Sequence, residues 1–79
     1  MRESASNAPT VPPKAWLKKR LYFVDTVQRA LNWKGTVAAQ IGDEVWSFTS
    51  PGWEEEAGEM GQSLIRNGQP IDGFVIAVS

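Results

Sequence analysis

The sequence predicts a small α+β domain, and three patterns support that fold class. Apolar residues recur at helical spacing over residues 14–33 and again over residues 51–67. Residues 36–49 and 71–78, by contrast, are rich in side chains that favour strands. The expected order is therefore helix, strand, strand, helix, strand (α-β-β-α-β), with a three-stranded, mostly antiparallel sheet packed on the helices.

Length and composition indicate how the chain is organised. Its 79 residues, of which 42% are hydrophobic and 22% charged, match one globular domain. Residues 1–13 hold three of the five prolines and few bulky side chains, so they predict a disordered N-terminal tail before a single domain over residues 14–79. No apolar run is long enough for a membrane span or typical of a signal peptide, and we expect a cytoplasmic protein.

Residues 14–33 admit two interpretations. Wound as one continuous helix, they gather eight apolar side chains on one half of the circumference, although Arg20 also falls within that half. Alternatively, residues 20–24 form a strand, and Asp25 caps a short helix that reaches Trp33. The first interpretation gives the order above, and the alternative gives the β-α-β-β-α-β order of a ferredoxin-like sandwich.

The middle of the chain predicts a β-hairpin. Residues 36–41 and 44–49 each favour a strand. Between them, Gly42 and Asp43 supply a two-residue turn of the kind that matches the twist of paired strands. Turn chemistry therefore accounts for Asp43 without any functional role.

Residues 51–67 give the clearest helical pattern. Ser50 is a natural N-cap, and three glutamates follow in the first turns, where the helix dipole favours negative charge. Gly68 provides a left-handed stop. We therefore expect the glutamates to be a solvated helix start and not a carboxylate site, because consecutive helical side chains diverge. Residues 71–78 then form the last strand, which is apolar on both faces.

Two missing residue types narrow the chemistry that the chain can perform. It has no cysteine and no histidine. Disulfides, thiol nucleophiles and thiolate metal sites are therefore excluded, and the commonest general base and metal ligand is absent. The sequence also contains no phosphate-binding loop, zinc-protease motif or nucleophile elbow. We expect a protein that is not an enzyme and that carries no cofactor and no metal.

Charge is divided unevenly along the sequence. Residues 1–40 carry a net charge of +5, and residues 41–79 carry a net charge of −6. Such a division suits an acidic or polyanionic partner, a head-to-tail pair of copies, or two halves that complement each other within one fold.

One face of the continuous helix is predicted to bind a partner. Four residues at spacings of four, seven and four lie opposite its apolar half, with further cations beside them. Aromatic and arginine side chains concentrate binding energy at interfaces, and clustered cations attract acidic partners. The alternative is that the aromatics cover the ends of the sheet and the lysines are ordinary solvated positions. The predicted binding residues are Lys18, Lys19, Tyr22, Arg29, Trp33 and Lys34.

The functional hypothesis is a small non-enzymatic regulator or accessory protein, of the type found in phages and mobile elements. It docks on a larger protein through this basic-aromatic helix face. A nucleic-acid-binding protein that uses the basic N-terminal half is the alternative. If the apolar strand over residues 73–78 lies at the sheet edge, it also predicts a homodimer. Membrane binding is not expected, because the apolar half of the helix is needed for the core.

Overall fold

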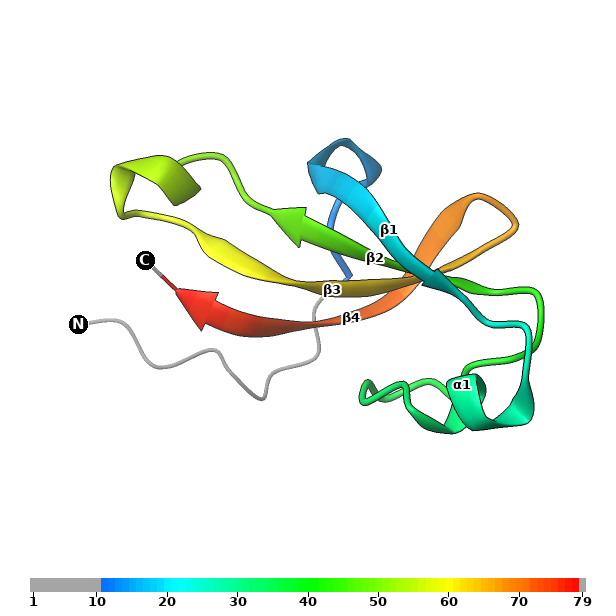
Figure 1. The fold of residues 1–79 in the computed structure, drawn as a ribbon. Helices are drawn as coiled ribbons and strands as arrows, with labels where there is room; N and C mark the ends of the chain where they lie inside the picture. Colours follow the sequence, from blue (N-terminus) through cyan, green and yellow to red (C-terminus); the bar gives the residue numbers. More distant parts are fainter. Residues whose placement is uncertain (1–10, 79) are drawn as a thin grey trace.

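The computed structural model describes residues 11–78 and shows a four-stranded antiparallel sheet with the strand order β1-β2-β3-β4 (Figure 1). Each strand pairs with the next one along the chain, so the sheet is a meander. A long connection, residues 24–43, joins β1 to β2 and contains α1. The elements are the 3-10 turn η1 (Lys14–Trp16), β1 (Leu17–Phe23), α1 (Val27–Leu31), β2 (Glu44–Thr49), the 3-10 turn η2 (Trp53–Glu55), β3 (Glu59–Arg66) and β4 (Gln69–Val78).

The predicted α+β fold, with three strands packed on helices, is wrong. Residues 11–78 are mostly strand, and α1 has only five residues. None of the helices in this part of the chain is long and apolar enough to cross a membrane. The continuous helix predicted over residues 14–33 is instead η1, β1 and α1. Arg20 explains why this segment does not form one continuous helix. In β1 it lies exposed opposite Trp46 and reaches Glu44, whereas the helix would have placed it among apolar side chains.

The alternative interpretation of this segment, a strand followed by a short helix, describes it better. The helix begins one residue later than expected, because Thr26 is the N-cap in place of Asp25. The hydroxyl oxygen of Thr26 accepts a hydrogen bond of 3.1 Å from the backbone amide of Arg29. The ferredoxin-like order as a whole does not occur, since the second predicted helix is also absent from the structure.

Residues 51–67, predicted as a helix, form a turn, η2 and the strand β3. Gly61 in β3 lies so close to β4 that a Cβ at this position would collide with the carbonyl oxygen of Phe74. After β3, Asn67 and Gly68 have φ angles of 54° and 78°. This left-handed pair forms the tight turn between two antiparallel strands, so Gly68 belongs to a β-hairpin and does not end a helix.

Part of the strand prediction is confirmed. β2 coincides with the strand predicted over residues 44–49, and β4 contains the strand predicted over residues 71–78. Residues 36–41, predicted as the first strand of a hairpin, are not a strand and belong to the connection. On the side away from β3, β2 pairs with β1, which comes from much earlier in the chain.

Two buried carboxylates fasten the connection to the sheet. Asp43, predicted as a simple turn residue, is buried and accepts hydrogen bonds of 2.9 Å and 2.8 Å from Nε and Nη2 of Arg66 on β3. Asp72 on β4 accepts a bond of 2.9 Å from Nε1 of Trp33 and one of 2.8 Å from a backbone amide of the connection. These bonds hold an irregular segment whose backbone lacks a periodic hydrogen-bond ladder.

The main core lies between the connection and one face of the sheet. Val24 and Trp33 from the connection pack with Val45 of β2 and Leu64 of β3. Phe48 is also fully buried, but it follows Val45 by three residues in the same strand and so points to the opposite face. The sheet therefore has apolar side chains on both sides, and the larger cluster lies under the connection.

Residues 12–16 cover part of that opposite face. Pro12 is buried, and the carbonyl oxygen of Pro13 accepts a hydrogen bond of 3.0 Å from the amide of Trp16. The ring centroids of Trp16 and Phe48 are 6.3 Å apart. Most of the tail predicted over residues 1–13 lies outside the described residues.

Candidate functional site

The helical face that was predicted to bind a partner does not exist, because its four central residues lie on three different segments. Lys18 and Tyr22 are on β1, Arg29 is on α1, and Trp33 lies in the connection after α1. Trp33 is only 7% exposed, and its ring centroid lies 5.1 Å from that of Phe74. Trp33 is therefore a core residue and not an exposed anchor for a partner.

Of the remaining central residues, Lys18 and Tyr22 lie along β1, and Arg29 on α1 lies beside the end of that strand. Lys18 and Lys19 are exposed on the strand, and Arg20 continues the run of cations. Tyr22 is half-buried near the end of β1, and the guanidinium carbon of Arg29 lies 5.9 Å from the centroid of its ring. Lys19 and Arg20 pair with successive residues of β2 and therefore point to opposite faces of this edge strand. We call the five residues along the strand (Lys18, Lys19, Arg20, Tyr22 and Arg29) the β1 surface.

Arg29 links α1 to the end of β1. Its Nη1 atom donates a hydrogen bond of 3.3 Å to the carbonyl oxygen of Phe23 and lies 3.6 Å from Oδ1 of Asp25. Burial raises the pKa of the Tyr22 hydroxyl above its ordinary value, and the positive charge of Arg29 offsets part of that rise. The phenol is therefore neutral at physiological pH, and its ring and hydroxyl are held beside a fixed cation.

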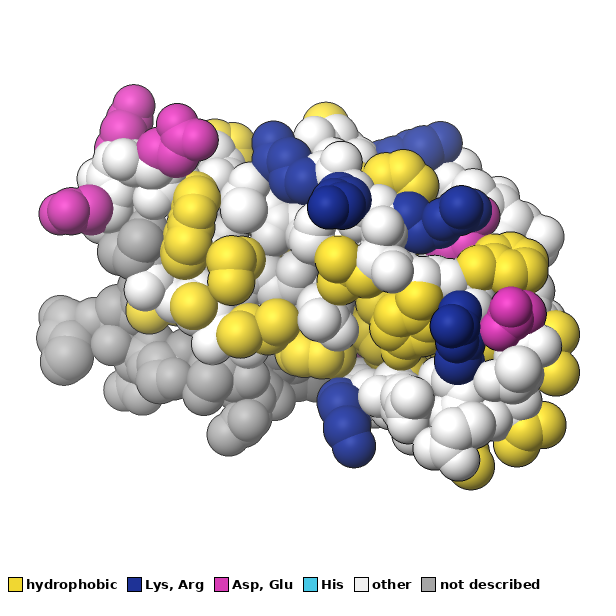
Figure 2. All heavy atoms as spheres, viewed as in Figure 1, with side chains coloured by type: hydrophobic (Ala, Val, Ile, Leu, Met, Phe, Trp, Pro, Cys, Tyr) yellow, Lys and Arg dark blue, Asp and Glu magenta, His cyan; other side chains and the backbone are white. Residues whose placement is uncertain are grey.

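Acidic side chains on this side of the molecule lie in two places, some beside the cations of β1 and α1 and a further group at the η2 turn. Figure 2 shows Lys and Arg side chains spread over β1 and α1, whereas a group of acidic side chains gathers at the η2 turn. Arg20 has one ionic partner, Glu44, at 3.5 Å, and both side chains are partly exposed, so the pair contributes little to stability. Lys18, Lys19 and Lys34 form no ion pair within residues 11–78. Lys34 is exposed in the connection after α1 and does not lie on β1.

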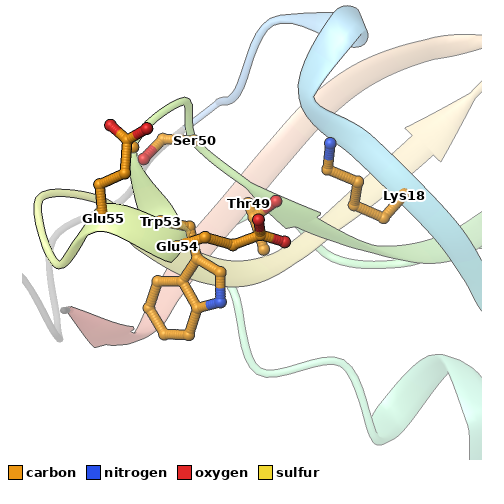
Figure 3. Close-up of a pocket in the computed structure, with 7 residues that line it drawn as sticks. Lys18, Thr49, Ser50, Trp53, Glu54 and Glu55 are labelled. Carbon is orange, nitrogen blue, oxygen red and sulfur yellow. The ribbon is translucent and has the colours of Figure 1, made fainter.

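An open pocket of about 560 Å³ lies beside the start of β1 (Figure 3). In Figure 3 the side chain of Glu54 extends towards β1, whereas that of Glu55 points away from it. Lys18 and Glu54 therefore place opposite charges on facing walls, next to the indole of Trp53. Such a pocket suits a single side chain with an apolar body and a polar end. The lining residues are Lys18, Thr49, Ser50, Gly52, Trp53, Glu54 and Glu55.

The sequence did not reveal this pocket, because Glu54 was assigned to a helix. The hydroxyl of Ser50, predicted as a helix N-cap, instead accepts a hydrogen bond of 2.8 Å from the amide of Glu59 and closes the loop between β2 and β3. Gly52 follows Pro51 and has a φ of 92°. Proline followed by glycine is a turn signal, and this dipeptide was the one local indication of a loop here.

Comparison with known proteins yields no relative, since no family model, no curated protein and no solved structure matches the chain. Residues 11–78 contain no group of three or more acidic, histidine or cysteine side chains that could hold a metal ion. The β1 surface and the adjoining pocket are the features from which a function can be inferred.

Proposed function

We propose that the chain is a small non-enzymatic binding protein that docks on a larger protein through its β1 surface. The observation that carries this proposal is a run of three exposed cations, Lys18, Lys19 and Arg20, on an edge strand. Tyr22 and Arg29 lie in contact beside the run. The partner surface that complements this charge is acidic.

Charge and side-chain type both support a protein partner. Exposed lysines speed association with an acidic surface and orient the encounter. Arginine and tyrosine are among the residues that contribute most to protein interfaces. Because Arg29 and Tyr22 are already in contact, little side-chain freedom remains to be lost when a partner covers them. The pocket between Lys18 and Trp53 adjoins the same strand and can accept one side chain of the partner.

A pair of matched charge reversals tests the proposal. Tagged wild-type protein, the variant Lys19→Glu and the control Lys34→Glu are used to capture proteins from a lysate of the native host. Bound proteins are identified by mass spectrometry. The affinity of the purified partner for each of the three forms is then measured at low and at physiological salt.

We expect an acidic partner that binds the wild type and the Lys34→Glu control equally well. Its affinity for Lys19→Glu should be about tenfold lower, because one attractive contact becomes repulsive. Added salt should weaken binding to the wild type. A partner that binds all three forms with the same affinity would show that β1 is not the docking surface.

Nucleic acid is the second candidate partner, and the same run of cations favours it. Lysines neutralise phosphates, and the ring of Tyr22 offers a surface on which a base can stack. The acidic group at η2 opposes a long polyanion on this side of the molecule. Gel-shift titrations with single- and double-stranded oligonucleotides at two salt concentrations distinguish the candidates. Binding that falls steeply with salt and is lost in Lys19→Glu would replace the protein partner with a nucleic acid.

A further inference from the structure

β4 forms the second edge of the sheet, and within residues 11–78 no strand pairs with its outer side. It has ten residues, more than any other strand in this part of the chain. From Gly73 to Val78 it contains neither a charge nor a proline. Ile76 and Val78 remain 48% and 42% exposed. A long, uncharged, apolar edge with unpaired backbone groups is a template for the addition of another strand.

β1, the edge on the other side, is a poor partner for β4. It carries the cations of the β1 surface, and its register with β2 shifts twice, between Leu17 and Lys19 and between Arg20 and Tyr22. Charges and bulges are the features that keep edge strands from pairing. An open-ended assembly that joins β4 of one copy to β1 of the next is therefore disfavoured.

We propose that a second copy of the chain pairs with this edge, β4 against β4 and antiparallel, about a two-fold axis. The two four-stranded sheets then form one continuous sheet. The axis places residues 73–78 opposite the same residues of the second copy. Because this segment has no charged side chain, the pairing brings no like charges together, and Ile76 and Val78 become covered.

The one charge on β4 does not oppose this pairing. Asp72 is 2% exposed, and its carboxylate accepts hydrogen bonds from Trp33 and from the backbone of the connection, on a face of the sheet and not along its edge. A domain of this size has a small core, so covering an apolar edge adds a substantial share of buried surface. The β1 surface lies at the opposite edge of the sheet, and the dimer leaves it available to another partner.

The mass of the protein in solution tests the proposal. In sedimentation equilibrium from micromolar to millimolar concentration, the wild type should approach twice the chain mass of 8.7 kDa and should dissociate on dilution. The variant Ile76→Lys places two cations in the new interface and should weaken dimerisation at least tenfold, as edge lysines do in natural sheets. The matched control Leu31→Lys changes a side chain that is 69% exposed on α1, and it should dimerise like the wild type.

Three outcomes would overturn the inference. These are a wild type that stays at the mass of one chain over the whole range, a dimer that Ile76→Lys leaves unchanged, and a series of larger assemblies that indicates open-ended association. Circular dichroism establishes whether Ile76→Lys is folded. If it is not, amide hydrogen exchange of the wild type decides, because only pairing through β4 makes exchange over residues 73–78 slower as concentration rises.

Discussion

The two ends of the sheet differ in how they are covered. At one end, which we call the loop end, the connection packs Trp33 onto the sheet and is fastened by Asp43 and Asp72. At the other, the η2 end, the turn after β2 leaves an open pocket beside Trp53. Each end contains a tryptophan, but Trp33 is buried with its N–H bonded, whereas Trp53 is half-buried in a pocket wall (Figure 3).

This difference makes the loop end the more important for stability, and it leaves the η2 pocket, beside the proposed docking strand β1, able to change without unfolding the protein. A buried carboxylate contributes to stability only while its hydrogen-bond donors remain. Substitution of a donor such as Arg66 or Trp33 at the loop end should therefore lower the free energy of unfolding. The side chains around η2 are more exposed and can change while the fold persists. Substitutions at the two ends should therefore separate unfolding from loss of binding.

The largest effect is expected from Trp33→Ala. The change removes a buried indole from the main core and should lower the free energy of unfolding by about 3–5 kcal/mol. It also removes the donor that Trp33 provides to Asp72, which adds to the loss. Urea denaturation followed by circular dichroism measures the change. A loss below about 1 kcal/mol would mean that the connection is not part of the core.

Acid should act next most strongly, through the carboxylate of Asp43. Hydrogen bonds from Arg66 hold the pKa of Asp43 below its ordinary value, although burial opposes this effect. A carboxyl group with a lower pKa in the folded state contributes its stability above the pKa of the unfolded state. It loses that contribution as the pH falls through the folded value. The wild type should therefore lose stability as the pH falls below the ordinary aspartate pKa of about 4.

Removal of the arginine should change this pH dependence. The variant Arg66→Gln should be less stable than the wild type at neutral pH and should lose less of its remaining stability in acid. The control Arg29→Gln removes an exposed ion pair with Asp25, a hydrogen bond to the carbonyl oxygen of Phe23 and the contact with Tyr22, but it leaves both buried carboxylates with their donors. It should therefore keep the wild-type pH profile. Thermal midpoints measured between pH 7 and pH 3 compare the three proteins. Parallel profiles for Arg66→Gln and the wild type would show that the Asp43 pair does not govern acid stability.

Some strands of the fold could be predicted from the sequence and others could not, and the local side-chain patterns explain the difference. β2 and most of β4 were predicted because strand-forming side chains dominate residues 44–49 and 74–78. β1 was predicted only as the alternative interpretation, over residues 20–24, because two register shifts break its alternation and leave spacings that also fit a helix. β3 was missed because Asn67 and Gly68, which form a tight turn, also resemble the end of a helix.

The candidate site was predicted only where neighbours in space are also near in sequence. Tyr22 and Arg29 remain in contact because a strand followed directly by a short helix brings them together. Trp33 was misplaced because its hydrogen-bond partner Asp72 is 39 residues away. A single sequence carries no local signal for that contact, and only the complete sheet makes Trp33 a core residue.

The smallest effect on stability is expected from Trp53→Ala, and this variant gives the sharpest test of the division between the two ends. Because Trp53 is half-buried in a pocket wall, its removal should lower the free energy of unfolding by about 1 kcal/mol or less. If the pocket holds a side chain of the proposed partner, affinity for that partner should still fall about tenfold. Urea denaturation and a binding titration on the same preparation measure both quantities. A stability loss as large as that of Trp33→Ala would make the η2 end a second core, and the pocket would then be a by-product of packing and not a place for recognition.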